Sequence, residues 1–115
     1  MDIQLKRGLL DVCALAAIKD KDSYGYQMIK DMKPYVEISE STLYPILRRL
    51  ESAELLTVKT AEYNGRLRKY YHITPHGIKR IEEFREEWRE VYAFLALCLD
   101  PLAKEGESHL RKDML

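Results

Sequence analysis

The segment LTVKTAEYNGRLRKYYHIT, residues 56–74, decides the fold of this chain. Apolar and polar residues alternate on both sides of Asn64-Gly65, a pair that favours a two-residue type I′ turn because both central positions need a positive φ. Such a loop fixes the register of two antiparallel strands, so that Leu56 lies opposite Ile73. The sequence therefore predicts a β-hairpin with a defined register.

The predicted register gives the hairpin two faces of opposite character. The apolar face holds Leu56, Val58, Tyr71 and Ile73. The basic and aromatic face holds Lys59, Tyr63, Arg66, Arg68, Tyr70 and His72. Because a two-stranded ribbon is weak by itself, we expect its apolar face to pack on helices and the hairpin to form a wing.

Three short helices are predicted before the hairpin. A stretch over residues 5–18 that is apolar nearly all round predicts a helix buried on several sides. Ser23 is the expected N-cap of a second helix over residues 24–33, which Pro34 ends. With a third helix after a brief connection, these elements have the outline of a helix-turn-helix unit.

The third predicted helix turns four apolar residues inward, Leu43, Ile46, Leu47 and Leu50. A proline inside a helix costs about 3 kcal/mol. We therefore expect Ser41 or Thr42 to cap this helix and to leave Pro45 in its first turn. Its outward side carries Arg48 and Arg49.

A longer helix is predicted to follow the hairpin, with Thr74 as its N-cap and Pro75 at its first position. Apolar residues then recur at alternating steps of three and four, as in a coiled-coil seam. They are Ile81, Phe84, Trp88, Val91, Leu95, Cys98 and Leu102. Pro101 is expected to stop or kink the helix near Leu99. This predicts a DNA-binding domain over residues 1–76, a dimerisation helix over 77–103 and a loosely ordered tail over 104–115.

Charge and composition narrow the class of protein. The net charge is zero, but residues 1–81 hold 14 Lys/Arg against 10 Asp/Glu and residues 82–115 hold 5 against 9. A basic front and an acidic rear suit a DNA-facing half joined to a dimerising half. Cys13 and Cys98 lie in apolar runs and are expected to be buried thiols. Without a signal pattern or a run of about 20 apolar residues, we expect a cytoplasmic protein with no membrane partner.

Several short motifs occur along the chain in a specific order. They are Tyr24-Gly25-Tyr26, Thr42-Leu43-Tyr44-Pro45, Arg49-Leu50-Glu51 before Leu55-Leu56, and Arg68-Lys69-Tyr70-Tyr71 before Thr74 and Gly77. Over about residues 5–95 the sequence thereby resembles the PadR family of bacterial transcriptional regulators. The resemblance implies a winged-helix repressor that acts as a homodimer on a dyad-symmetric operator. It also implies that the last helix contacts the partner's first and last helices.

Two positions depart from the pattern of this family. Glu54 stands where the family usually has a glycine in left-handed conformation, and a side chain there costs about 1 kcal/mol if that geometry is kept. Ser41 replaces a frequent glycine at the start of the third helix, where a capping serine is suitable.

Candidate DNA contacts lie on the third helix and on the wing, because a recognition helix reads base edges near its N-terminus and cations meet phosphates. They are Ser41, Thr42, Tyr44, Arg48, Arg49, Arg66 and Arg68. The alternative is an ordinary solvated surface in which Arg49 pairs with Glu51 or Glu54. Lys69 shares the face of Leu56, so its aliphatic stem is expected to lie along that face.

The last helix has two further interpretations. As a dimer interface it acts together with the first helix, through Leu5, Leu9, Ile81, Trp88, Val91, Leu95 and Cys98. By resemblance to multidrug-sensing family members, a small aromatic or cationic effector instead stacks on Trp88. Its pocket is then lined by Phe84, Trp88, Val91, Tyr92 and Leu95.

Neither an enzyme nor a metal protein is predicted. His72 and His76 are four apart, but Thr74-Pro75 separates a strand end from a helix start, so the spacing does not suit a metal. No nucleophile elbow, phosphate loop or paired-carboxylate site occurs, and no cofactor is expected. The prediction is a sequence-specific transcriptional regulator that acts as a ligand-responsive repressor. Its rivals are a winged-helix protein-interaction module without DNA binding, and the dimerisation domain of a larger enzyme, against which the absence of a cofactor domain counts.

Overall fold

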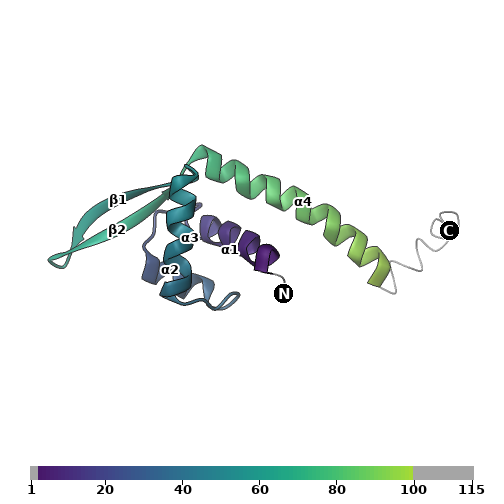
Figure 1. Cartoon of the computed structure of the whole chain (residues 1–115), viewed down its shortest axis with the longest axis horizontal. Coiled ribbons are helices and arrows are strands. Elements are labelled where there is room, and N and C mark those ends of the chain that lie inside the picture. The colour runs from purple at the N-terminus through teal and green to yellow at the C-terminus, as the bar shows by residue number, and fades with distance from the viewer. Residues whose placement is uncertain (1–2, 100–115) are drawn as a thin grey trace, which may run out of the picture. The chain divides into compact units, whose positions relative to one another are not determined.

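The computed structural model describes residues 3–99, and side chains from residue 7 onward. In chain order its elements are α1 (Ile3–Ala17), α2 (Gly25–Met32), α3 (Glu40–Ser52), β1 (Leu56–Tyr63), β2 (Arg66–Ile73) and α4 (Pro75–Leu99) (Figure 1). The chain divides into two compact units after Glu82, and α4 belongs to both. The expectations for residues 100–115, including those for Pro101 and Leu102, lie outside the described residues.

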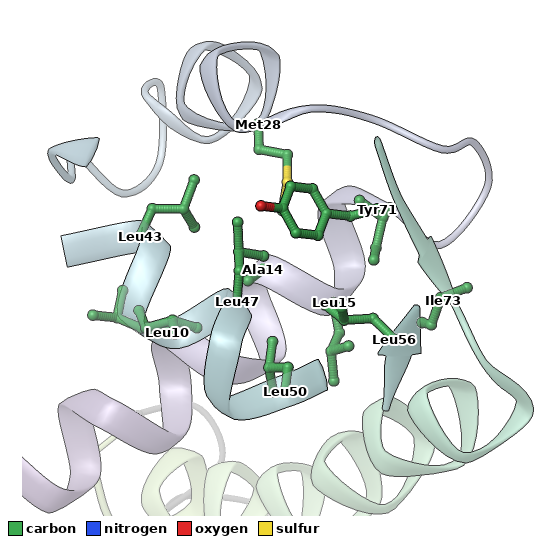
Figure 2. Close-up of a cluster of buried hydrophobic side chains, with 12 residues drawn as sticks. Leu10, Ala14, Leu15, Met28, Leu43, Leu47, Leu50, Leu56, Tyr71 and Ile73 are labelled. Carbon is green, nitrogen blue, oxygen red and sulfur yellow. The ribbon is translucent and has the colours of Figure 1, made fainter. Parts of the chain in front are cut away.

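The first unit has the predicted winged helix-turn-helix architecture. Helices α1, α2 and α3 contact one another in all three pairs, and α3 also contacts β1. Their apolar faces meet in one cluster, where Leu15, Met28 and Leu47 are almost fully buried. Figure 2 shows Tyr71 of β2 reaching into this same cluster. Burying each large apolar side chain stabilises the fold by about 1.5–3 kcal/mol, so this core holds the three helices together.

The hairpin confirms the predicted register. Leu56 pairs with Ile73 and Val58 with Tyr71 across two antiparallel strands. At the turn Asn64 has φ 50° and Gly65 has φ 77°, the positive values that a type I′ turn requires. The apolar face packs on the helices as expected, and Tyr71 is only 4% exposed. The turn lies at the end of the hairpin that projects away from the helices (Figure 1).

The two predicted helix caps upstream of the hairpin are wrong. Ser23 does not cap α2, because its backbone forms a two-hydrogen-bond bridge with Tyr71 of β2 and Tyr24 takes the cap position. The N-cap of α3 is Ser39, whose hydroxyl accepts from the amide of Thr42. Helix α3 therefore begins earlier than predicted, and Pro45 is its sixth residue rather than part of its first turn.

The chain at the end of α3 is hydrogen-bonded to the N-cap residue of α4. Glu54 has φ 61°, the left-handed conformation that favours glycine, and the amides of Glu54 and Leu55 donate to the carbonyls of Glu51 and Leu50. These two bonds form a Schellman cap. As predicted, Thr74 caps α4, and its hydroxyl accepts from the amide of Gly77 and donates to the carbonyl of Glu54. Helix α3 is thus fixed at its C-terminal end.

Glycine is required at residue 77 because the first turn of α4 lies against the chain that follows α3. A Cβ there would lie 2.2 Å from the carbonyl oxygen of Leu55. Within the first unit, Ile78 and Ile81 also pack against the core.

None of the helices within residues 3–99 combines the length and the apolar character needed to cross a bilayer.

Candidate nucleic-acid interface

The outward face of α3 carries hydroxyl and basic side chains. Its inward face buries Leu43, Ile46, Leu47 and Leu50, as predicted. On the opposite side Ser41, Thr42 and Arg48 are exposed. A helix that is fixed by its apolar face and presents polar groups to solvent is the geometry with which recognition helices enter a major groove.

Three hydroxyls gather at the N-terminus of α3. The Ser39 Oγ lies 2.8 Å from the Ser41 Oγ and 3.2 Å from the Thr42 Oγ1, and it accepts from the amide of Thr42. Each hydroxyl can form further hydrogen bonds with a phosphate or a base edge. Sequence reasoning had not included Ser39 in this group. The sequence signal for a helix that begins after Ser39 was Glu40, because an acidic residue is favoured in the first turn of a helix.

The two adjacent arginines of α3 have different surroundings. Arg49 forms an ion pair with Asp11 of α1, not with Glu51 or Glu54, the partners named in the alternative interpretation. This pair ties α3 to α1, and the Arg49 side chain remains 41% exposed. Arg48 is exposed and forms no ion pair among residues 7–99. Arg48 is therefore the basic side chain of α3 best placed to meet an external anion.

Tyr44 contacts α2 as well as the surface. A Cβ on Gly25 would lie 2.6 Å from the Tyr44 hydroxyl oxygen, so any larger residue at position 25 would displace the Tyr44 ring. Tyr44 is 36% exposed. The candidate DNA contact therefore has a structural role too, because its ring sets the approach of α3 to the start of α2.

A groove of about 630 Å³ lies between the start of α2, α3 and the hairpin. Among its lining residues three are basic and none is acidic. It is lined by Tyr24, Gly25, Tyr26, Tyr44, Tyr63, Asn64, Arg66, Leu67, Arg68, Lys69 and Tyr71. The structure thus brings the wing candidates Arg66 and Arg68 together with Tyr44, whereas Ser41, Thr42 and Arg49 line a separate groove toward α1.

Arg68 is held between elements that are distant in the sequence. Its guanidinium carbon lies 3.9 Å from the ring centroid of Tyr24 and 4.1 Å from that of Tyr63. Tyr24 also contacts Tyr70 edge-on, with 5.8 Å between ring centroids. No local pattern predicts that Tyr24, at the start of α2, meets a wing arginine, because that contact depends on how the hairpin packs.

Two further titratable side chains, Cys13 and His72, contact other parts of the chain. Partial burial raises the pKa of the Cys13 thiol above its ordinary value, which favours the protonated thiol over the reactive thiolate. The His72 Nδ1 lies 2.7 Å from the Asp22 Oδ1, so this side chain links β2 to the loop before α2. Within the described part of the chain no group of three or more His, Cys, Asp or Glu side chains is arranged to hold a metal ion.

The second unit presents an apolar stripe along α4. Phe84 and Trp88 are stacked, with ring centroids 6.3 Å apart and planes 5° from parallel. Large apolar side chains of this stripe are strongly exposed, Trp88 at 45%, Val91 at 51%, Tyr92 at 63% and Leu95 at 42%. Cys98 is half-buried, as are Leu9 on α1 and Ile81, which packs on the core of the first unit. The side chain of Leu5 lies outside the described set.

Comparison with known proteins relates this chain to one family. The family model "Transcriptional regulator PadR-like family" matches residues 14–83. A transcriptional regulator of Mycobacterium tuberculosis is 28% identical over 110 residues, which cover 92% of each chain.

Solved structures have the same fold. A protein of Streptococcus mutans is 38% identical, with a TM-score of 0.74 over 83% of this chain and 90% of its own. A PadR-like transcriptional regulator of Bacillus cereus is 31% identical, with a TM-score of 0.74 over 84% of this chain and 97% of its own. The Bacillus subtilis PadR, solved in complex with operator DNA, shares the fold at 20% identity, with a TM-score of 0.63 over 66% of this chain and 46% of its own.

Proposed function

This chain belongs to the PadR-like family of transcriptional regulators, a non-enzymatic family, and from that premise we propose that it binds operator DNA in the cytoplasm as a homodimer and represses transcription. One observation carries the proposal: α3 exposes Ser41, Thr42 and Arg48 to solvent, and its Tyr44 lines a groove that has three cations and no carboxylate. A surface of this composition suits the phosphates and base edges of duplex DNA.

In the proposed complex α3 enters the major groove. Ser41 and Thr42, near its N-terminus, contact base edges or phosphates together with Ser39. Arg48 contacts a guanine edge or a phosphate. Arg49, which Asp11 already engages, is the weakest of the α3 candidates.

The wing supplies the second set of contacts. Arg66 follows the turn of the hairpin, and Arg68 faces the same side of the sheet. We expect both to meet phosphates beside the groove that α3 occupies. Tyr44, at the junction of α3 and α2, completes this surface.

The apolar stripe of α4 is the proposed dimer interface. Its exposed residues form a larger apolar surface than scattered single side chains do, and such patches mark association sites. A second copy of the chain is the proposed occupant, through Trp88, Val91, Leu95 and Cys98 of the second unit and through Leu5, Leu9 and Ile81 of the first. On a dyad-symmetric operator the two recognition helices must then reach major grooves about 34 Å apart.

A planar aromatic or cationic effector is proposed to act on the same helix. The stacked rings of Phe84 and Trp88 offer a flat aromatic surface, with Val91, Tyr92 and Leu95 nearby along α4. A compound that binds one dimer arrangement better than the other shifts the spacing of the two recognition helices and releases DNA. Since Trp88 is the only tryptophan of the chain, its fluorescence reports such binding directly.

Binding to the duplex upstream of the protein's own gene tests the proposal. We expect Arg48→Ala to weaken this binding by about tenfold or more, since one good base or phosphate contact is worth about 1–3 kcal/mol at each half-site. Arg85→Ala, which removes an equal charge from an exposed position of α4, is the matched control and leaves affinity within about twofold. A wild-type protein with no affinity for any duplex, or an equal loss in both variants, contradicts the proposed surface.

A further inference from the structure

Arg68 is the only wing cation that the described residues show in contact with two aromatic rings, those of Tyr24 and Tyr63. We propose that these tyrosines are positioning residues, which hold the Arg68 guanidinium as a preformed contact for one phosphate of the DNA backbone. The inference rests on the proposed function, because it names the chemistry by which the wing holds DNA. We call these three residues the arginine clamp.

The distances are those of a cation over aromatic faces. A guanidinium within about 6 Å of a ring centroid is attracted by the ring's negative face, and Arg68 satisfies this for Tyr24 at 3.9 Å and Tyr63 at 4.1 Å. A ring stacked on a guanidinium leaves free the N–H groups along its edge, which match two oxygens of a phosphate.

The clamp orders Arg68 before any ligand binds. An arginine free in solvent loses rotamer freedom when it meets a phosphate, which opposes binding. Arg68 is half-buried between the rings of Tyr24, the N-cap of α2, and Tyr63 of β1, so its side chain is already confined in the free protein. Binding then costs less conformational entropy than it does for the exposed Arg66 at the end of the hairpin.

The clamp is also connected to the recognition helix. Ser23 exchanges backbone hydrogen bonds of 2.7 and 3.3 Å with Tyr71, which fixes the chain before α2 on the hairpin. Tyr24 follows, and next to it Gly25 receives the ring of Tyr44 from α3. The position of Arg68 relative to α3 is therefore set by packed contacts, and the clamped phosphate fixes how far along the duplex α3 lies.

The charge of the surroundings favours an anion over other ligands. The groove beside the clamp is lined by Arg66, Arg68 and Lys69 and by no carboxylate. A phosphate contact carries no information about base sequence, so it contributes equally to specific and non-specific DNA. This separates the clamp from Arg48, whose proposed contacts include base edges.

A double-mutant cycle on full-length protein tests the clamp. Affinity is measured by fluorescence anisotropy for wild type, Tyr63→Leu, Arg68→Ala and the double variant. The probes are the duplex upstream of the protein's own gene and an unrelated duplex. We expect Tyr63→Leu to weaken binding about three- to tenfold on both duplexes, from the usual strength of a cation–aromatic contact. In the Arg68→Ala background the same change has no further effect.

Tyr63→Phe is the matched control, because it keeps the ring and removes only the hydroxyl. We expect it to bind within about twofold of wild type, since a phenylalanine face also attracts cations. Tyr63 is 50% exposed, so Tyr63→Leu is expected to fold, which circular dichroism and the thermal midpoint check. Arg68→Lys gives a second route, because it keeps the charge and loses the planar donor edge, and it should weaken binding nearly as much as Arg68→Ala.

The outcomes separate the clamp from the proposed function. Wild-type affinity in Tyr63→Leu, additive losses in the double variant, or wild-type affinity in Arg68→Lys overturns the clamp. If wild type binds DNA and Arg48→Ala weakens it, those same results leave the proposed function standing. If wild type binds neither duplex, the proposed function fails and the clamp fails with it.

Discussion

Helices α3 and α4 differ in how far their apolar side chains are buried. On α3 the apolar side chains are buried within the chain, Leu43 at 0% and Leu47 at 1% exposure. On the second unit's part of α4 they are exposed, Trp88 at 45% and Leu95 at 42%. The first unit therefore completes its own core, whereas the second unit's part of α4 carries apolar surface that residues 7–99 do not cover. Mutations of apolar residues in α3 should accordingly change the free energy of unfolding, whereas mutations of apolar residues in α4 should change the dissociation constant of the dimer.

The largest expected effect is on the core side of this comparison. We expect Leu47→Ala to lower the free energy of unfolding by about 2–5 kcal/mol, because a fully buried leucine leaves a cavity when it is truncated. Urea denaturation at a fixed protein concentration measures this. Leu99→Ala, at an exposed position near the end of α4, is the control. An equal loss in both variants would remove the distinction between the two helices.

The next effect concerns association through α4. We expect Trp88→Ala to weaken the dimer by about 2 kcal/mol or more, since buried tryptophans are frequent anchors of interfaces. Sedimentation equilibrium should then show monomer at concentrations where wild type is dimeric. Lys79→Ala, at an exposed position in the first turns of α4, should leave the dimer constant unchanged. A wild type that is itself monomeric at working concentrations argues against this role of α4.

A smaller effect, of opposite sign, is expected at the end of α3. Glu54 has φ 61°, and glycine adopts that conformation without the steric cost of a Cβ. We expect Glu54→Gly to raise the free energy of unfolding by about 1 kcal/mol without changing DNA affinity. Glu51→Gly, inside α3, is the comparison and should destabilise the protein. A lower thermal midpoint for Glu54→Gly would show that the Schellman cap depends on the side chain.

The smallest effect distinguishes the neighbouring arginines of α3. Arg49 is partly exposed and paired with Asp11, so Arg49→Ala should lower stability by at most about 1 kcal/mol. Because Asp11 engages Arg49 in the free protein, its loss should weaken DNA binding less than that of Arg48. Chemical denaturation and anisotropy on the same samples measure both quantities. The reverse order of DNA affinities would place Arg49, rather than Arg48, at the interface.

Local patterns predicted most parts of the fold that depend on neighbouring residues, except the N-cap of α3, which is Ser39 rather than Ser41 or Thr42. The hairpin register followed from Asn64-Gly65 because a two-residue loop leaves one alignment of the strands. The inward residues of α3 and the cap at Thr74 followed from helical spacing and from Thr-Pro chemistry. These features required no knowledge of tertiary contacts.

Features that depend on distant contacts were not predicted. Ser23 is a chemically suitable cap, but its backbone pairs with Tyr71 of the hairpin instead. Arg49 has two acidic neighbours in sequence, yet its partner is Asp11 on another helix. The contact of Arg68 with Tyr24 likewise spans α2 and β2. In each case tertiary packing decides between partners that local sequence leaves equivalent.

The salt dependence of DNA binding tests the central claim most directly, because a surface of cations meeting phosphates releases counterions. Anisotropy titrations of the wild-type protein on the duplex upstream of its own gene, from about 50 to about 200 mM salt, measure it. For a dimer with six or more phosphate contacts, the account gives a fall in affinity of about a thousandfold or more. An affinity that stays constant across this range would contradict it.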